Sequence, residues 1–144
     1  MKRSLVSGIV ANVLLLCENN DTPKDWEWDE CLSLLAELKA KSDLAGEPIR
    51  VLVSTLGGGP NAAQRKRLEG VIGSSATPTA VVSNSLKLRF ISAAIALFNA
   101  DHRAFTVAER LEAYKHLRLN TTQTRALEAA IGQMSKLVTE EAKH

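Results

Sequence analysis

The sequence predicts an α/β domain, a mostly parallel sheet of about four to five strands flanked by helices. Two observations lead to this prediction. Short apolar runs bounded by turn residues alternate with longer stretches in which apolar residues recur at helical spacing. A chain of 144 residues with 45% hydrophobic residues can also bury a core without disulfides or metals. Because strand–helix–strand units favour parallel neighbouring strands, the helices are expected to cover the faces of one sheet.

Residues 4–18 are rich in Val, Ile and Leu, and their first part alternates in side-chain type. This pattern predicts either one long strand or a two-strand hairpin that turns near Gly8 or Asn12 and adds an antiparallel edge. Two basic residues precede the run, as in a signal peptide, but Leu16 stands before Cys17 where lipoprotein cleavage needs a small residue. The run is also too short to cross a membrane as a helix. We therefore expect a core strand in a cytoplasmic protein without integral membrane association.

Turn and capping signals predict the remaining elements. Thr22 and Pro23 suit the start of a first helix, and Thr106 with Glu109 forms a capping box at the start of a later one. We expect strands at residues 49–55, 78–83 and 102–105. We expect helices at about residues 22–41, 61–72, 86–99 and 106–117, and a final helix from about residue 121. The chain thus divides into an α/β domain, residues 1–119, and a C-terminal helix, residues 120–144, packed on that domain or at a dimer interface.

Helical faces indicate which side chains enter the core. The helix after the second strand region is expected to turn Gln64 and Arg65 mostly outward. The next helix carries a wide apolar face, and we expect Phe90 and Phe98 in the core. In the final helix the apolar residues from Leu127 to Leu137 recur at spacings of four, three and three. Such a stripe must bury against another surface.

Composition argues against several classes of function. A nucleic-acid-binding protein usually has a clustered basic surface, and the net charge of +2 does not indicate one. Aromatic residues make up 4% of the chain, which leaves no set of side chains to stack on bases. We therefore expect no nucleic-acid partner. Cys17 and Cys31 are interpreted as buried reduced thiols, with a disulfide as the alternative. The sequence has no Cys-x-x-Cys pair, and its three histidines lack ligand spacing. We therefore expect no metal and no cofactor.

The sharpest local feature is the glycine turn after the strand at residues 49–55. Gly57, Gly58 and Gly59 allow close backbone approach, and a helix begins directly after them. A helix start presents free amides and partial positive charge, which suits an anion, and Arg65 lies about one turn into the helix. The spacing is neither that of a P-loop nor that of a dinucleotide fingerprint. The plainer interpretation is a tight strand-to-helix connection.

A second helix start follows the next strand. If the two strands are parallel neighbours, both helix starts lie at the same sheet edge, where open α/β sheets bind ligands. We call the resulting surface the polar notch. Its members are Gly57, Gly58, Gly59, Asn61, Arg65, Ser83, Asn84, Ser85 and Arg89. Plain helix capping by Ser or Asn is the alternative explanation of the second start.

From the strand at residues 78–83 onward, a strand that ends in a Ser turn leads to an Arg-containing helix, then to a short strand closed by Phe, then to a helix with a Thr-x-x-Glu cap. The residues of this pattern are Ser83, Ser85, Arg89, Phe105, Thr106, Glu109, Ala113 and Tyr114. This succession resembles that of SpoIIAA-like proteins of the STAS superfamily. The strand VLVST with its glycine turn also fits. The resemblance covers about residues 4–119 and implies a STAS-type fold that works by binding.

The resemblance also implies a regulatory role, because the best-known STAS proteins are anti-sigma-factor antagonists. These are phosphorylated on a Ser or Thr at the helix start after the central strand, within an Asp-Ser-Ser-Gly-like motif. This chain has TLGGGPN at residues 55–61, with no Ser at the helix start and no Asp before it. We therefore expect a STAS-type module without the phosphorylation switch.

Two classes of function stay open. The first is a non-catalytic binding or regulatory module that contacts an unidentified protein partner at this surface, with a homodimer as a further option. The second is a domain that binds a small molecule, an anion or a lipid head group. No enzyme is expected, because no nucleophile with its own base and orienting group can be assembled. Asp101 and His102 are strand neighbours that point to opposite faces, and His116 is expected to pair with Glu112 on a helix surface.

Overall fold

The structure is a computed structural model that describes residues 3–73, 77–97, 99 and 101–139. These residues form one five-stranded sheet in the order β1-β2-β3-β4-β5. The strands are β1 (Leu5–Val10), β2 (Val13–Glu18), β3 (Arg50–Thr55), β4 (Thr79–Val82) and β5 (His102–Phe105). Strands β2 to β5 run parallel, and β1 pairs antiparallel with β2. The α/β class with a five-stranded sheet is as predicted.

A two-residue turn makes the sheet mixed. Ala11 and Asn12 have φ angles of 51° and 65°, which is the left-handed pair that a type I′ hairpin turn requires. The turn places Val10 opposite Val13. Of the two alternatives for the N-terminal segment the structure therefore has the hairpin, which turns at Asn12 and not at Gly8. The prediction of a mostly parallel sheet is corrected: the sheet is mixed.

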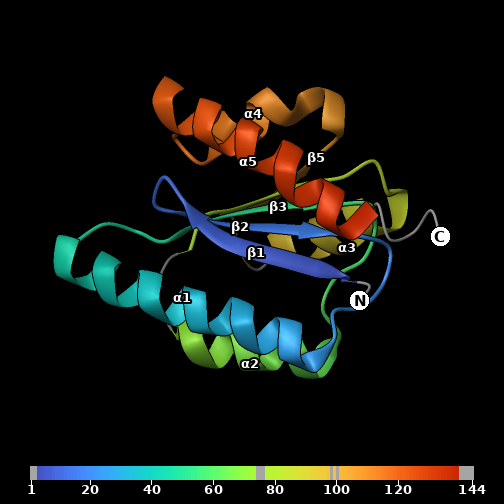
Figure 1. Ribbon diagram of the computed structural model, residues 1–144, viewed down its shortest axis with the longest axis horizontal. Helices are drawn as coiled ribbons and strands as arrows, with labels where there is room; N and C mark the ends of the chain where they lie inside the picture. Colours follow the sequence, from blue (N-terminus) through green and yellow to red (C-terminus); the bar gives the residue numbers. More distant parts are fainter. Residues whose placement is uncertain (1–2, 74–76, 98, 100, 140–144) are drawn as a thin grey trace.

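The helices form a layer on each face of the sheet. They are α1 (Asp25–Ala45), α2 (Ala62–Ile72), α3 (Leu86–Ala96), α4 (Arg110–His116), which follows the 3₁₀ turn η1 (Val107–Glu109), and α5 (Thr121–Thr139). Figure 1 shows α1 and α2 on one side of the sheet and α4 and α5 on the other, with α3 behind the sheet, where it contacts β5. Within the described ranges no helix has the length and apolar character needed to cross a membrane.

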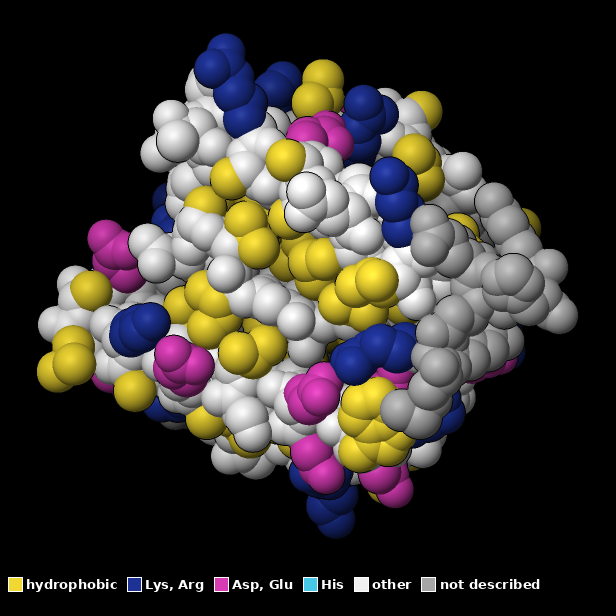
Figure 2. Space-filling view, in the orientation of Figure 1, with side chains coloured by type: hydrophobic (Ala, Val, Ile, Leu, Met, Phe, Trp, Pro, Cys, Tyr) yellow, Lys and Arg dark blue, Asp and Glu magenta, His cyan; other side chains and the backbone are white. Residues whose placement is uncertain are grey.

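Each face of the sheet buries its own hydrophobic cluster. Strand β2 serves both clusters because successive residues point to opposite faces. Leu14 and Leu16 pack with Trp28 of α1, whereas Leu15 packs with Leu127 of α5. Helix α5 lies across β1 and β2, and α1 lies mainly over β1. Figure 2 shows the side of the molecule on which β1 lies between α1 and α5. Hydrophobic side chains gather across its centre, with most charged side chains around them.

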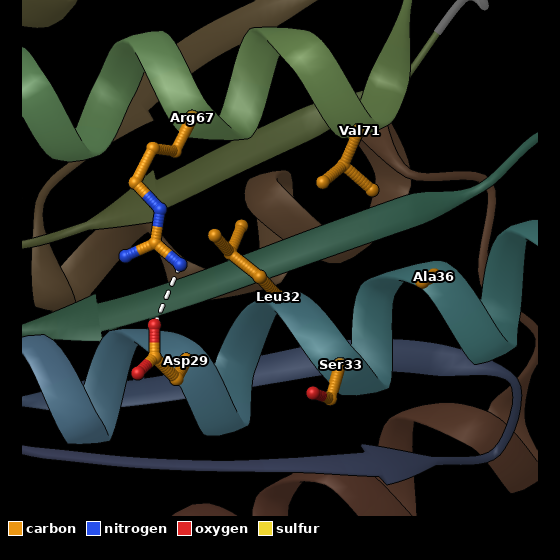
Figure 3. A pocket seen from close by; sticks show the side chains of 6 residues that line it. All are labelled: Asp29, Leu32, Ser33, Ala36, Arg67 and Val71. Carbon is orange, nitrogen blue, oxygen red and sulfur yellow. Dashed lines mark hydrogen bonds and ion pairs between the residues drawn. The ribbon is translucent and has the colours of Figure 1, made fainter.

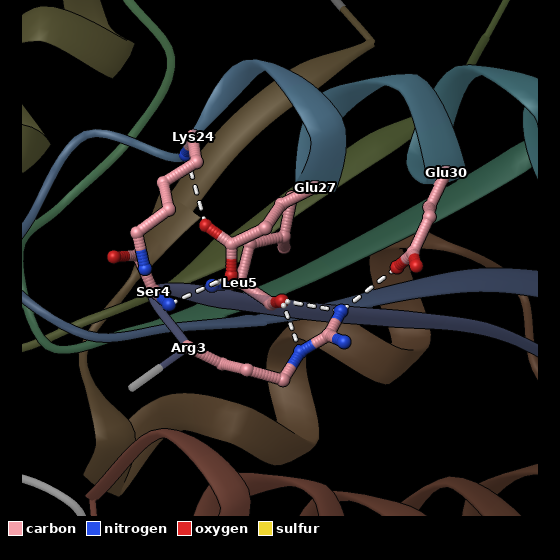
Figure 4. A network of polar contacts seen from close by, with 6 residues as sticks. All are labelled: Arg3, Ser4, Leu5, Lys24, Glu27 and Glu30. Atoms are coloured by element: carbon pink, nitrogen blue, oxygen red, sulfur yellow. Dashed lines mark hydrogen bonds and ion pairs between the residues drawn. The ribbon is translucent and has the colours of Figure 1, made fainter. Parts of the chain in front are cut away.

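The buried carboxylate of Glu27 ties the N-terminal strand to α1. Glu27 Oε2 accepts hydrogen bonds from the backbone N–H groups of Ser4 (2.8 Å) and Leu5 (3.0 Å), and Oε1 accepts one from Lys24 (2.9 Å) (Figure 4). These bonds satisfy both oxygens of a side chain that is fully buried. Glu27 is therefore part of the structural joint between β1 and the start of α1.

Some helix boundaries differ from the prediction. Helix α1 begins at Asp25 and not at Thr22. Pro23 lies before the helix, and its carbonyl oxygen accepts a hydrogen bond from a side chain of α2. The helix also ends later than predicted, at Gly46, whose φ of 68° is the usual left-handed C-cap. Phe98, which was expected in the core, lies outside the described residues.

The two cysteines are buried free thiols on opposite faces of the sheet. Cys17 belongs to the cluster under α4 and α5, and Cys31 belongs to the cluster under α1. A disulfide between them is therefore excluded by the position of the sheet. Burial raises the pKa of the Cys17 thiol to about 11 and that of Cys31 to about 12.

Both thiols are expected to be unreactive in the folded protein. A thiol that is buried and protonated offers neither access nor thiolate to a reagent. In a titration with a chromogenic disulfide at neutral pH, we expect no rapid reaction in buffer and reaction of both thiols in denaturant. Rapid reaction of one thiol in buffer would contradict the burial described above.

Candidate functional site

Three turns lie against one another at the carboxyl edge of the parallel strands. They are the segment after β2, the glycine turn after β3 and the serine turn after β4. The Gly58 N–H donates to the carbonyl oxygen of Asn19 over 2.8 Å, which ties the first turn to the second. The Val107 N–H donates to Asn84 Oδ1 over 3.0 Å, which ties the third turn to η1. The edge where the polar notch was predicted is thus a seam between loops.

Gly58 lies where no side chain fits. A Cβ there would collide with the carbonyl oxygen of Asp21 and would lie 2.6 Å from the carbonyl oxygen of Asn19. The buried Thr55 hydroxyl holds the turn from below, since it donates to the Gly58 carbonyl oxygen over 2.8 Å. Gly58 therefore serves the close approach of two backbone segments and not that of a ligand.

Gly57 brings the glycine turn next to the serine turn. Its φ is 152°, and a Cβ would lie 2.8 Å from Asn20 Oδ1 and 3.4 Å from Ser85 Oγ. The Gly57 N–H donates to the Thr55 hydroxyl over 3.1 Å. The starts of α2 and α3 thus lie close together, as predicted. The space between their turns is occupied by protein atoms.

The start of α2 is closed by its own capping box. The Gln64 N–H donates to Asn61 Oδ1 over 2.8 Å, and the Asn61 N–H donates to Gln64 Oε1 over 3.0 Å. The Gln64 side chain is buried and donates onward to the Pro23 carbonyl oxygen over 2.8 Å. The prediction that Gln64 points outward is wrong, because its amide joins the start of α2 to the start of α1. The cap uses the Gln64 N–H, one of the amides of this helix start that were expected to be free for an anion.

The serine turn is likewise committed to the fold. Ser83 is fully buried, and its hydroxyl accepts the Ser85 N–H over 3.1 Å. Ser85 in turn caps α3 by accepting the Leu88 N–H over 3.3 Å. The capping explanation of this helix start fits the structure directly.

The structure brings only part of the predicted notch together. Gly57 lies beside Ser85, and Gly59 has open space where a Cβ would be. Arg65 turns back, with Nη1 2.9 Å from the Pro60 carbonyl oxygen. Arg89 lies within electrostatic range of Glu109. Hydrogen bonds from Thr106 lower the pKa of Glu109, and the charges of Arg89 and Arg103 add to the effect.

The surface that sequence reasoning missed is the outer side of α3. The predicted core residue Phe90 is 69% exposed and Leu97 is 83% exposed, whereas Ser92 is buried. Leu86, Ala93 and Ala94 are also exposed. At 100° per residue these five positions fall on one side of the helix. We call them the α3 stripe, and it corrects the prediction that the apolar face of this helix packs inward.

The physical reason is the place of α3 at the end of the sheet. Helix α3 contacts β5, the last strand, which has only four residues. Ser92 is buried and Leu88 and Ile95 are half-buried, whereas Leu86, Phe90 and Leu97 stay exposed. The signal was present in the sequence, because residues 86–96 place apolar side chains around most of the helix, more than one short strand can bury.

Two further exposed apolar residues lie near the start of α3. Leu56 precedes Gly57, which approaches Ser85, and Val107 bonds through its N–H to Asn84. Both residues thus lie next to the start of α3. Exposed apolar surface that gathers in this way marks interaction sites on proteins.

Two grooves lie away from the notch. The first, of about 550 Å³, runs between α1 and α2 (Figure 3). It is lined by Leu32, Ala36 and Val71, and an ion pair of 2.6 Å between Asp29 Oδ1 and Arg67 Nη2 bridges its two helices. The ion pair joins the two helices, and its opposite charges offset one another above an apolar floor.

The second groove, of about 370 Å³, lies between β5 and α4. Its lining mixes Arg103 and Lys115 with Glu109 and Glu112, so its charges offset one another. His116 was predicted to pair with Glu112, but its Nε2 lies 2.7 Å from the carbonyl oxygen of Asp101 instead, while Lys115 contacts Glu112. Among the residues that the structure describes, no three His, Cys, Asp or Glu side chains are grouped to hold a metal ion.

Comparison with known proteins does not assign the chain to a class of proteins beyond its α/β fold. No family model matches the chain, and neither a curated protein nor a solved structure matches it significantly. The molecule is an α/β domain whose carboxyl sheet edge is closed by loops, with an exposed apolar helix beside it.

Proposed function

We propose that this protein is a non-catalytic binding module that acts through protein–protein contacts, and that the α3 stripe is its contact surface. The exposure of Phe90 and Leu97 on a single helix side is the observation that carries the proposal. Large apolar and aromatic side chains with no internal partner are the residues that dominate protein interfaces. The α3 stripe is not the contact surface that the sequence predicted, which was the polar notch. Protein atoms fill that notch, so we place the contact on the exposed side of α3.

The proposal includes a STAS-type relationship without a phosphorylation switch. Its support is the run of matching residue types from Ser83 to Tyr114 together with the order of strands and helices. The Thr55 hydroxyl is buried and bonded to the glycine turn, which is consistent with a structural role for the hydroxyl nearest the family's phosphorylation position.

The second class of function, binding of an anion, small molecule or lipid head group at the notch, has less support. Its amides and hydroxyls at Asn61, Ser83 and Ser85 already have partners in the protein. A ligand would have to displace these bonds without an obvious replacement. We expect inorganic phosphate and glycerophosphate to leave the melting temperature unchanged, and a clear rise that Ser85→Ala abolishes would favour this second class.

A pair of matched substitutions tests the proposed contact surface. Leu97 on α3 and Leu44 near the end of α1 are 83% and 90% exposed, so Leu→Asp should leave the fold intact at both positions. Truncating or charging a central interface residue typically costs about 2 kcal/mol or more of binding free energy. We therefore expect Leu97→Asp to abolish binding of protein partners and Leu44→Asp to preserve it.

The measurement is quantitative mass spectrometry of proteins retained by the immobilised chain from its own cell extract. Partners of the α3 stripe are those retained by the natural chain and by Leu44→Asp but lost with Leu97→Asp. Identical retention by all three chains would refute the α3 stripe as the contact surface. Circular dichroism on the two variants verifies that both are folded.

A further inference from the structure

The α3 stripe matches itself when its direction is reversed. Four of its five residues, Leu86, Phe90, Ala93 and Leu97, form the self-matching row, and the fifth, Ala94, lies beside this row and faces Arg89 of a second copy. Consider a second α3 running antiparallel about a two-fold axis that passes between residues 91 and 92. Leu86 then faces Leu97 of the second copy, and Phe90 faces Ala93. Each aromatic ring meets a small side chain and not another ring, as interdigitating helix surfaces require.

The charges on α3 also suit an antiparallel copy. The first turn of α3 contains no acidic residue and carries Lys87, and its last turn contains no basic residue. A cation near the positive end of a helix is unfavourable within a single chain. In the antiparallel pair Lys87 would lie beside the negative C-terminal end of the second α3, beyond which Asp101 is exposed. A second copy therefore improves an electrostatic arrangement that the isolated chain leaves unfavourable.

We propose that the α3 stripe is covered by a second copy of this chain, in a two-fold dimer with α3 packed antiparallel on α3. This inference rests on the proposed function and names the partner of the same surface. A two-fold interface must be self-complementary, and both the size pattern and the charge pattern of α3 meet that condition. Leu56 and Val107, exposed near the start of α3, enlarge the apolar area available to the pair.

Sedimentation velocity tests the dimer. We expect a mass of twice 15.6 kDa at high protein concentration and reversible dissociation on dilution. Phe90→Asp should raise the dissociation constant by about a hundredfold or more, because it places a charge at the centre of the apolar contact. Leu44 is exposed near the end of α1 and does not belong to the α3 stripe, so Leu44→Asp should leave the dissociation constant unchanged.

Lys87→Glu separates the dimer from a merely exposed helix. Glu near a helix start is favourable for the single chain, so the substitution should raise the melting temperature measured at low, monomeric concentration. In the dimer it places a negative charge beside the negative end of the second α3. We therefore expect weaker self-association, by about tenfold, together with a more stable monomer. Association that is unchanged or strengthened would overturn the antiparallel arrangement.

Cross-linking gives a readout that does not depend on affinity. The two native thiols are buried, so a cysteine introduced at Ala93 is the reactive one. A short bis-maleimide should join Ala93→Cys chains into dimers, and Leu44→Cys chains should not be joined. Absence of a cross-link at Ala93 in protein that sediments as a dimer would overturn the α3 contact.

The experiments distinguish the loss of the dimer from the loss of the proposed binding function. A chain that stays monomeric at every concentration overturns the dimer, while the proposed function stands if Leu97→Asp still abolishes capture of another protein. Flotation with vesicles containing anionic lipid covers the remaining occupant. Binding of the monomer to such vesicles that Phe90→Asp abolishes would overturn the dimer in favour of a membrane surface.

Discussion

Gly58→Ala is expected to destabilise the protein by about 3 kcal/mol or more. The added methyl group would collide with the Asp21 carbonyl oxygen and lie 2.6 Å from that of Asn19. Both are backbone atoms, so no side chain can rotate away to make room. The loops must separate, and the 2.8 Å bond from the Gly58 N–H to Asn19 is then lost. For a domain of this size the change corresponds to a fall of about 10 °C in melting temperature.

Gly59→Ala is the matched control, one residue further along the same turn. A Cβ at Gly59 has no neighbouring atom within 4 Å, and Gly59 does not have a positive φ. The substitution should therefore be neutral or stabilise the protein slightly, since it reduces the freedom of the unfolded chain. Urea unfolding of the two variants measures the contrast. Equal stabilities would show that the turns after β2 and β3 are not in the contact described above.

The contrast between these glycines shows where sequence reasoning stops. Three adjacent glycines predict a tight turn before a helix, and that turn is present. Which glycine is indispensable depends on Asn19 and Asp21, about 40 positions earlier in the chain. Nothing local in the sequence states that the turn after β2 lies against the turn after β3. The register of β2 against β3 places these two turns side by side.

Local signals were sufficient where the chemistry itself is local. The capping box of Thr106 and Glu109 is present, with Glu109 Oε1 2.9 Å from the Thr106 backbone nitrogen. The interacting groups of this capping box are three residues apart, so the sequence contains the whole interaction. At the hairpin the local signals left one long strand or a turn near Gly8 or Asn12 open, and the structure has the turn at Ala11 and Asn12, of which only Asn12 belongs to a type that readily accepts positive φ.

The candidate site was displaced for a different reason. Apolar residues on a helix indicate burial, but they do not say whether the sheet is wide enough to receive them. At α3 the receiving strand is the edge strand β5, so Ser92 faces inward and Phe90 faces solvent. Apolar side chains in excess of the available core leave an exposed apolar surface on the helix, and the proposed contact rests on that surface.

The second large effect concerns a buried carboxyl group at the end of β2. Glu18 is 3% exposed, and its Oε1 has no hydrogen-bond partner among the described residues. Burial raises the pKa of Glu18 from 4.5 to about 8, and the nearby Glu27 carboxylate adds to the rise. The buried Cys31 thiol also lies within its electrostatic range. Glu18 is therefore expected to be protonated in the folded protein at neutral pH.

This group makes the protein less stable as the pH rises. Between about pH 4.5 and 8 the folded chain holds one proton more than the unfolded chain, so the free energy of unfolding falls by up to about 1.4 kcal/mol per pH unit. Burial lowers the pKa of His102 below 6.5, which destabilises the fold on the acid side and has the opposite slope. Above pH 6.5 the His102 contribution fades and the buried thiols contribute only close to pH 8, so Glu18 dominates the window from pH 6.5 to 8. We expect a loss of about 2 kcal/mol across it.

Glu18→Gln should remove that loss, because the amide is neutral at every pH and nearly isosteric with the protonated acid. We expect the variant to have a flat stability profile from pH 6.5 to 8. At pH 8 it should exceed the natural chain by about 4 kcal/mol, because the loss in the natural chain accumulates from about pH 4.5 upward. Urea unfolding at several pH values provides the measurement. Glu37→Gln, at an exposed position on α1 in an ion pair with Lys41, is the matched control and should keep the natural slope. A slope that persists in Glu18→Gln would assign the pH dependence to another group and would show that the Glu18 carboxyl reaches solvent or a partner in the folded protein.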